Sequence, residues 1–357
     1  MKIVTVLRSL KSGGAERHAL QLMKGLRARG HEALYAGPMK GWLGQQLRAE
    51  GFGGIDLPLS GLYDLPSVVR LALYARRVGA DLIHGHLTRG AWYAGLAARL
   101  AGLPNVATAH SDNAGKHFGR ADRIIAVSQA VADFLVREGY DAARIRMVHH
   151  GIADIAARLP AGAREATRRS LGLAADEPAL LMAARIVPAK GHDTALRALA
   201  RLGDQPWTLL VAGDHHGDLG PQMQALAQEL GIAARVRFLG LREDMPALMT
   251  ASDVLLAPSR REALSLTLLE ASACRLPIVA TRVGGIGEVV EEGASGFLVA
   301  PDDPPALAAA LAPLLADAAL RARCGARARQ RFEAGFLEDA MFDKTVAVYR
   351  EACGGRR

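Results

Sequence analysis

The sequence has few cysteines, few aromatic side chains and no long apolar run. Of its 357 residues, three are cysteine and 5% are aromatic. Cys274, Cys324 and Cys353 are scattered, without the Cys-x-x-Cys spacing of zinc or redox sites, so we expect reduced thiols in the cytoplasm. No apolar run reaches the roughly 18 residues that cross a bilayer. The opening MKIVTVLRSL lacks a signal-peptide cleavage site and is predicted to be a first strand.

The positive charge of the chain lies in its first half. The formal net charge is +8 overall. Residues 1–165 hold 22 Lys and Arg against 13 Asp and Glu, a net charge of +9, whereas residues 166–357 hold 22 against 23. A basic half suggests an anionic partner such as a nucleic acid, an acidic membrane surface or a phosphorylated substrate. An Arg-rich composition on a solvated surface is the alternative. We expect no nucleic acid, because the basic half has neither interleaved aromatic residues nor a recognisable reading motif.

Short apolar runs alternate with helical Ala/Leu/Arg stretches, and this series occurs twice. The first series comprises KIVTVL, HEALYAG, ADLIHGH, NVATAH and RIIAVS, and the second ALLMAAR, WTLLVAGD, RVRFLG, DVLLAPS, PIVATRVGG and GFLVA. Alternation of strand and helix predicts a parallel sheet covered by helices. We therefore predict an α/β protein with two doubly wound domains, joined near residues 154–169, with a cleft between them. Ligands of such sheets collect at the carboxyl ends of the strands.

The segment REALSLTLLEA carries two carboxylates, Glu262 and Glu270. In one helix they would lie about 12 Å apart along the axis, which is too far for a glycosidase pair at about 5–9.5 Å. A helix that begins near Ser265, a favourable N-cap residue, gives them separate roles. Glu262 then lies in a loop beside a reacting group, Glu270 accepts hydrogen bonds from a diol, and the free amides at the helix start can hold an anion. Solvated surface carboxylates are the alternative.

Two other loops offer groups for a phosphate. In LLMAARIVPAKG, Arg185 ends a strand and Lys190 precedes a glycine that starts a helix, so these two cations could neutralise a diphosphate. In LRSLKSGGAER, Gly13 and Gly14 follow the first strand and would let a phosphate or a sugar approach the backbone. The second loop is not the Gly-x-Gly-x-x-Gly motif of dinucleotide sites. A solvated turn in the first loop and a tight structural turn in the second are the alternatives.

Several of the 11 histidines lie near predicted strand ends. His110 closes NVATAH, where it could hydrogen-bond a substrate hydroxyl or a departing phosphate. His84 and His86 share one face of a strand, but the sequence places no third ligand beside them. The adjacent pairs His149–His150 and His215–His216 direct their side chains apart if they are extended. We therefore predict no metal site.

Together these segments resemble glycosyltransferase family 4, the retaining nucleotide-sugar transferases of GT-B fold, over nearly the whole chain. The strongest match is PSRREALSLTLLEASACRLPIVATRVGGIGEVV, which resembles the Glu-x7-Glu motif of the family with its following strand and Gly-Gly turn. ARIVPAKG resembles its Arg-x4-Lys, SGGAER its glycine loop, ATAHSD its histidine strand and VHHGIAD the segment that leaves the first domain. All five occur in the order that the family has.

The resemblance implies roles for the candidate residues. It places the donor sugar beside His110 and Glu262, the candidate catalytic residues, and assigns the ribose hydroxyls to Glu270. The acceptor hydroxyl attacks from the face of the leaving group, and no side chain need act as a nucleophile. Because no Asp-x-Asp occurs in the chain, we expect no metal and no cofactor. The donor diphosphate is assigned to Gly13, Gly14, Arg185, Lys190, Leu264, Ser265 and Leu266.

The resemblance also implies the domain order of a GT-B enzyme. An acceptor-binding Rossmann-like domain at residues 1–160 precedes a nucleotide-sugar-binding Rossmann-like domain at residues 161–335. Residues 336–357, which include the amphipathic FLEDAMFDKTVAVYREA, form a helix that crosses back to the first domain.

We expect a glycosyltransferase that moves a sugar from a nucleotide-sugar donor to a glycan or lipid-linked acceptor, in lipopolysaccharide or other cell-envelope biosynthesis. Its basic half suggests an acceptor that is anionic or embedded in an anionic leaflet. The stretch GLYDLPSVVRLALYARRVG, with Leu62 and Tyr63, fits either a surface anchor or an ordinary sheet-covering helix. The expected location is the cytoplasm, peripheral on the inner membrane. Alternatives are an epimerase or phosphorylase of the same fold, and a non-catalytic partner subunit of a glycan assembly complex.

Overall fold

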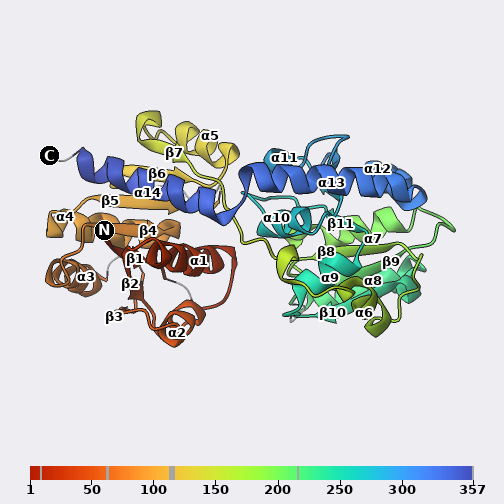
Figure 1. Ribbon diagram of the computed structural model, residues 1–357, viewed down its shortest axis with the longest axis horizontal. Coiled ribbons are helices and arrows are strands. Elements are labelled where there is room, and N and C mark those ends of the chain that lie inside the picture. The colour runs from red at the N-terminus through yellow and green to blue at the C-terminus, as the bar shows by residue number, and fades with distance from the viewer. Residues whose placement is uncertain (9, 62–63, 112–116, 215–216, 356–357) are drawn as a thin grey trace. The chain divides into compact units, whose positions relative to one another are not determined.

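The computed structural model describes residues 1–8, 10–61, 64–111, 117–214 and 217–355, and the chain divides into two compact units. The first unit comprises Met1–Gly151 and Glu338–Arg357, and the second comprises Ile152–Leu337. Each unit is built on one parallel β-sheet with helices on its faces (Figure 1). The α/β fold with two doubly wound sheets that the sequence predicts is confirmed.

The first unit contains a seven-stranded sheet in the order β3-β2-β1-β4-β5-β6-β7, with every pairing parallel. Its strands are β1 Lys2–Val6, β2 Glu32–Gly37, β3 Gly54–Asp56, β4 Leu82–His86, β5 Asn105–Ala109, β6 Arg123–Ala126 and β7 Ile145–Met147. Its helices are α1 Gly14–Ala28, α2 Trp42–Ala49, α3 Leu65–Arg77, α4 Leu87–Ala101, α5 Gln129–Arg137 and α14 Glu338–Gly354.

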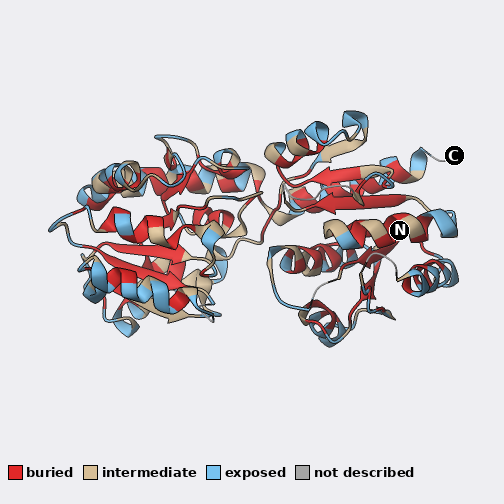
Figure 2. Ribbon diagram, turned by 180° about the vertical axis from the view of Figure 1, so that it is seen from behind, coloured by how far each residue is buried: buried red, intermediate tan, exposed pale blue. Residues whose placement is uncertain are grey.

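The alternation of side chains along β1 explains the two cores of this unit. Successive residues of a strand point to opposite faces of the sheet. Ile3 packs into a cluster with residues of α1 and α14, whereas Val4 and Val6 pack with residues of α3 and α4 on the other face. Strands buried on both faces read as continuous apolar runs, and Figure 2 shows them as the buried layer of the unit.

The second unit contains a six-stranded sheet in the order β10-β9-β8-β11-β12-β13, again with parallel pairings. Its strands are β8 Ala179–Ala183, β9 Thr208–Ala212, β10 Val236–Gly240, β11 Val254–Ala257, β12 Ile278–Thr281 and β13 Gly296–Val299. Its helices are α6 Ala163–Ser170, α7 His192–Leu199, α8 Leu219–Glu229, α9 Met245–Ala251, α10 Leu266–Ala273, α11 Ile286–Val289, α12 Pro304–Ala316 and α13 Ala318–Gly335.

The strand order of each sheet reverses at one point. In the first sheet the reversal lies between β1 and β4, and in the second it lies between β8 and β11. Loops that leave two such strands diverge to opposite sides and open a crevice at the carboxyl end, which is where doubly wound sheets bind ligands. The loops after β1, β4, β8 and β11 are therefore the places to look for chemistry.

The units differ slightly from the predicted bounds of 1–160, 161–335 and 336–357. Ile152 joins the second unit because its N–H donates to the carbonyl of Phe336 at 2.9 Å and it forms a parallel bridge with Leu337. The predicted C-terminal helix is present as α14, which packs on α1, β5 and β6 of the first unit (Figure 1).

Two further features bear on the composition. The three cysteines, all among the described residues, form no disulfide, and burial raises the pKa of the Cys274 thiol to about 11. Among the described residues no single helix has the length and hydropathy of a membrane span. The pair α12 and α13 meets that test jointly, with a bend of 106° between the helices.

Candidate active site

The loop after β8 carries two of the predicted basic residues. Arg185 is exposed, two residues beyond the end of the strand. Lys190 ends a 3-10 turn, Pro188–Lys190, and is followed by Gly191 with φ of +66°. A Cβ atom at Gly191 would lie 2.0 Å from the carbonyl oxygen of Pro258. Glycine is therefore required there both for the left-handed backbone and for the close approach of the loop after β11.

The loop after β11 brings Glu262 to Lys190. The Nζ atom of Lys190 and Oε2 of Glu262 form an ion pair, and both side chains are partly buried. Sequence reasoning assigned Lys190 to a diphosphate and Glu262 to a sugar, but did not predict that they contact each other. A partly buried ion pair at a switch point can exchange one partner for a charged ligand, because a lysine ammonium is a compact charge on a flexible stem.

Helix α10 begins where the sequence predicts. Ser265 is its N-cap residue, with an extended backbone, and Glu270 lies in the second turn of the helix and is half-buried. The Ser265 side chain makes no capping hydrogen bond. The first amide groups of a helix have no partner within the helix and carry the positive end of its dipole. The start of α10, with Leu264 and Leu266, therefore offers amide donors beside Lys190 and Glu262.

Arg260 and Gly284 fix the loops that follow β8 and β11. Sequence reasoning selected neither of them as a site residue. The guanidinium of Arg260 hydrogen-bonds both carboxylate oxygens of Asp193, at 3.0 and 2.7 Å, and Oδ1 of Asp302 at 2.7 Å. Burial alone would raise the pKa of the Asp193 carboxyl, but the hydrogen bonds and charge of the Arg260 guanidinium lower it. Gly284 has φ of +52°, and a Cβ atom there would lie 1.5 Å from the carbonyl oxygen of Glu262. The Gly-Gly turn thus presses directly on the Glu262 loop.

Five histidines converge at the carboxyl end of the first sheet. His84 and His86 come from β4, His110 follows β5, His150 follows β7 and His18 comes from α1. The ring centroid of His18 lies 5.7 Å from that of His86, 5.1 Å from that of His110 and 4.5 Å from that of His150. The sequence analysis found no third histidine beside the pair on β4, and the structure corrects this, because α1 supplies His18.

Hydrogen bonds connect most of this histidine cluster. Nδ1 of His86 lies 3.0 Å from Nε2 of His110, and Nδ1 of His150 lies 2.9 Å from Nδ1 of His18. Nδ1 of His84 lies 2.7 Å from the hydroxyl of Tyr349 in α14, and its Nε2 lies 2.8 Å from the hydroxyl of Thr108 in β5. Burial, together with neighbouring imidazoles, lowers the pKa of all five well below the ordinary histidine value. The cluster is therefore uncharged at neutral pH.

Two buried nitrogens of the cluster have no hydrogen-bond partner among the described residues: Nε2 of His86 and Nδ1 of His110. A buried polar atom without a partner costs about 1–3 kcal/mol. These two atoms therefore favour any ligand that can satisfy them.

Gly13 is the N-cap residue of α1, and a Cβ atom there would lie 2.7 Å from Oε2 of the buried Glu16.

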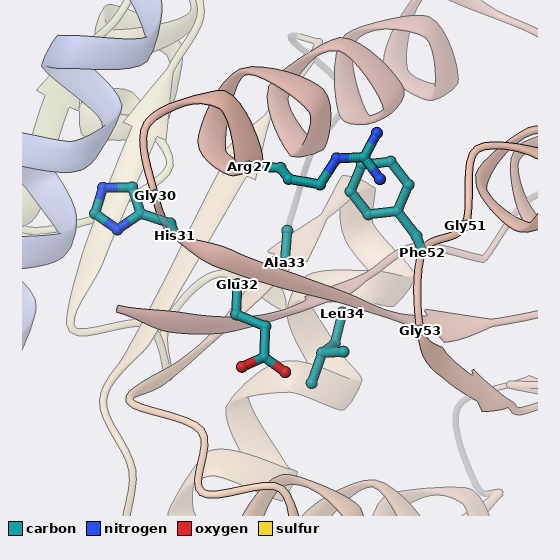
Figure 3. Close-up of a pocket in the computed structure, with 9 residues that line it drawn as sticks. All are labelled: Arg27, Gly30, His31, Glu32, Ala33, Leu34, Gly51, Phe52 and Gly53. Atoms are coloured by element: carbon teal, nitrogen blue, oxygen red, sulfur yellow. The ribbon is translucent and has the colours of Figure 1, made fainter.

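A depression of about 430 Å³ lies elsewhere on the first unit (Figure 3). Its lining comes from the end of α1, the start of β2 and the segment before β3, and Figure 3 shows the Arg27 side chain against the Phe52 ring. The guanidinium carbon of Arg27 lies 3.9 Å from that ring centroid. This depression is at the amino ends of the strands and contains none of the predicted site residues.

The structure groups the predicted site residues into two sets. Lys190, Glu262 and the start of α10 form one set on the second unit, with Arg185 and Glu270 on the same two segments. Gly13, Gly14 and His110 belong to the first unit. Sequence reasoning missed His18, which directly follows the selected segment SGGAER, and gave no site role to His150, which lies within the selected segment VHHGIAD. The pair His215–His216 lies outside the described residues.

Two family models match this chain. One, described as glycosyl transferases group 1, matches residues 163–331, and the other, described as glycosyltransferase family 4, matches residues 12–154. The chain is also similar to D-inositol 3-phosphate glycosyltransferase of Mycobacterium tuberculosis, with 34% identity over 337 residues that cover 85% of this chain and 68% of the relative.

Solved structures share the fold. The chain is similar to a glycosyltransferase from Rickettsia africae, with a TM-score of 0.90, 23% identity and coverage of 98% of each chain. It is similar to Anabaena HepE in complex with UDP and glucose, with a TM-score of 0.88, 26% identity and coverage of 98% of this chain and 100% of that one. It is also similar to WaaG, described as involved in lipopolysaccharide biosynthesis, with a TM-score of 0.75, 21% identity and coverage of 97% and 99%.

Proposed function

We propose that this chain transfers a sugar, with retention of its anomeric configuration, to an anionic acceptor. The chain belongs to the family of group 1 and family 4 glycosyltransferases and is a nucleotide-sugar-dependent transferase of GT-B fold. The observation that carries the proposal is the Lys190–Glu262 pair beside the start of α10, at the switch point of the second sheet. This arrangement can receive a diphosphate and a sugar side by side.

The donor diphosphate is neutralised by fixed charges of the second unit. Lys190 leaves Glu262 for a phosphate oxygen, and Arg185, which is exposed, adds a planar guanidinium. The amides at Leu264, Ser265 and Leu266 face the same anion. Negative charge grows on the diphosphate as the sugar leaves, and preorganised donors stabilise that charge most in the transition state. In this proposal two cationic side chains and a helix start take the place of a metal ion.

The remaining site residues take the roles that the resemblance implies. Glu270 accepts hydrogen bonds from the ribose hydroxyls, and Glu262, released from Lys190, faces the donor sugar. The resemblance assigns His110 to that sugar, and Gly13 and Gly14 to the phosphates. The bond from the anomeric carbon to the phosphate oxygen breaks, the acceptor oxygen bonds to the same face, and its proton passes to the departing phosphate.

A donor screen followed by product analysis tests this function. Thermal shift against UDP-, GDP-, ADP- and CMP-sugars identifies the donor, and nuclear magnetic resonance of the product gives its anomeric configuration. We expect transfer with retained configuration that persists in EDTA. An inverted product, or an absolute need for magnesium, would overturn the proposal. Epimerised donor without any acceptor would support the epimerase alternative, and donor binding without turnover would support a partner subunit.

The acceptor is proposed to carry negative charge. The first unit holds 24 Lys and Arg against 15 Asp and Glu, whereas the second holds 20 against 21. A phosphorylated glycan or glycolipid of the cell envelope, such as a lipopolysaccharide core, would suit this unit. The relative named D-inositol 3-phosphate glycosyltransferase favours a second candidate, a phosphorylated polyol. Acceptor-dependent release of the nucleotide, measured with both acceptor classes and their unphosphorylated forms, distinguishes them, and equal rates without phosphate would reject an anionic acceptor.

Helix α3 supports a peripheral contact with an anionic membrane at the cytoplasmic face. Leu65, Val69 and Leu73 are 59%, 48% and 60% exposed, although they are large and apolar. They recur every four residues and so form one stripe along the helix. The exposed part of α3 also carries Arg70, Arg76 and Arg77, and the helix contains no acidic residue. Apolar side chains flanked by cations suit an anionic lipid surface. Leu62 and Tyr63, which the sequence analysis placed with this stretch, lie outside the described residues.

Vesicle flotation tests this contact. Anionic vesicles should carry the wild-type chain, because each basic side chain near such a surface adds about 1 kcal/mol, and neutral vesicles should carry less. Replacing the three apolar residues, Leu65→Ser, Val69→Ser and Leu73→Ser together, should abolish flotation without loss of turnover on a soluble acceptor. Leu241→Ser, at a 75% exposed leucine of the second unit, is the matched control and should float like wild type. Flotation that is absent, or unchanged in the triple variant, would reject the contact.

A further inference from the structure

We infer that the first unit contains a site for a divalent transition-metal ion of the zinc class, formed by His18, His86 and His110. One ligand nitrogen of each of these residues lies within 4.8 Å of the others. A metal site is not among the roles proposed above, although His110 has one of them, and all three ligands belong to the first unit. Its three ligands come from α1, β4 and the end of β5, so only the folded sheet creates it.

The spacing of the three rings suits a single ion. Their centroids are 5.7, 5.1 and 5.3 Å apart. Three imidazoles at tetrahedral angles on one zinc ion, with Zn–N bonds of about 2.0–2.1 Å, place their centroids about 5.2 Å apart. The three imidazoles are therefore already nearly as far apart as a bound ion would hold them, and small ring rotations would complete the coordination.

The state of the imidazoles also suits a metal. A metal ligand must offer a lone pair, and a neutral imidazole carries one on a ring nitrogen. Nδ1 of His150 lies 2.9 Å from Nδ1 of His18, so Nε2 of His18 remains for the ion. A hydrogen bond from the non-ligating nitrogen is the usual support of a metal-bound histidine. The unpartnered nitrogens of His86 and His110 show that hydrogen bonding among the described protein groups does not satisfy this cluster.

The donor set limits the kind of ion. Imidazole nitrogens suit zinc, copper, nickel and iron, whereas magnesium and calcium require oxygen ligands. Three protein ligands leave a fourth position for water or for an oxygen of a substrate, as in open zinc sites. His110 is the half-buried member, whereas His18 and His86 are buried. The open position is therefore on the His110 side of the cluster.

Metal titration of the full chain tests the site without reference to turnover. The chain is first stripped with EDTA, and zinc is then titrated in competition with a chromophoric chelator. We expect one zinc ion per chain and no response to magnesium. Cobalt in place of zinc should give the visible absorption bands of a tetrahedral cobalt centre, and added zinc should remove them.

Single substitutions identify the ligands. His18→Ala, His86→Ala and His110→Ala should each raise the zinc dissociation constant by at least about 100-fold, since even the loss of an outer hydrogen bond to a ligand costs 10–100-fold. Circular dichroism and the melting temperature establish that each variant is folded. His110→Ala is the most informative variant if a fully buried position fails to fold, because His110 is only half-buried.

His31→Ala is the matched control. His31 is another histidine of the first unit, and its Nδ1 lies 3.0 Å from the terminal amine of Met1, which is a second pair of close nitrogens. The variant should bind zinc like wild type. Zinc binding that is lost in His31→Ala, that persists in His110→Ala, or that is absent from the wild-type chain would each overturn the proposal.

Discussion

The two units share one architecture and differ in the chemistry at their strand ends. Both are parallel sheets whose order reverses once, and both carry candidate groups near the carboxyl ends of their strands. The first unit gathers imidazoles there, which burial keeps uncharged, in a unit of net charge +9. The second gathers the ion pair of Lys190 and Glu262, in a unit of net charge −1. A doubly wound sheet supplies the location of a site, and the side chains that the loops, strands and helices place there decide its chemistry.

This difference has a physical consequence for the ligands of each unit. A diphosphate brings several negative charges, and fixed cations can meet them without a change of protonation. Neutral imidazoles can instead donate one hydrogen bond, accept another or bind a metal ion. Substitutions in each unit can therefore show whether the two chemistries act separately.

Lys190→Ala should reduce kcat by about 10²–10³-fold, because removal of one preorganised group that stabilises developing charge has this effect. Steady-state kinetics with a saturating donor measures it. Lys24→Ala is the control, since Lys24 forms a Lys–Glu ion pair of its own with Glu50 on the first unit. A Lys190 variant with wild-type turnover would show that the second unit does not rely on fixed charge.

Glu270→Ala should weaken donor binding by about 10–100-fold, because a hydrogen bond to a charged group is worth about 1.5–3 kcal/mol. Isothermal titration calorimetry with the donor measures the dissociation constant. Glu229→Ala, at an exposed glutamate of α8 in the same unit, should bind the donor like wild type. If both variants bind alike, Glu270 does not contact the nucleotide.

Tyr349→Phe should destabilise the first unit by about 1–2 kcal/mol, because it leaves one nitrogen of the buried His84 without its partner. Urea denaturation measures the free energy of unfolding. Donor affinity should change little, because Arg185, Lys190 and Glu270, the charged groups proposed to bind the donor, lie on the second unit. Tyr74→Phe, on α3, is the control and should have a smaller effect. A Tyr349 variant with lost donor affinity and unchanged stability would contradict the separation of the two units.

Asp154→Asn should lower the melting temperature slightly, by the equivalent of about 1 kcal/mol, since the lost ion pair is partly exposed. Oδ1 of Asp154 accepts a hydrogen bond from Nη1 of Arg329 at 2.7 Å. This contact lowers the pKa of Asp154 below its ordinary value. The stabilisation is therefore fully present above the unfolded pKa and is lost as the pH falls through the lower folded pKa. Melting curves of both proteins from pH 7 to pH 3 should converge at the acidic end; a constant difference would exclude the ion pair as its source.

Several elements of the fold could be read from the sequence. All eleven predicted apolar runs are strands, because buried parallel strands are continuous apolar segments flanked by helices. The two strands that the prediction lacked, β3 and β7, are three residues long and lie at the two edges of the first sheet. Short edge strands are half-exposed and carry little apolar signal, so local pattern alone does not reveal them.

The candidate site was likewise predictable from the sequence only in part. The start of α10 at Ser265 and the separate places of Glu262 and Glu270 follow from local rules of capping and spacing, and the structure has both. Local sequence pattern thus predicts eleven of the strands, the start of α10 and the residue types of each loop. Only the tertiary structure decided that Lys190 meets Glu262 and that His18 joins His86 and His110, because strand order and helix packing bring together residues far apart in the chain.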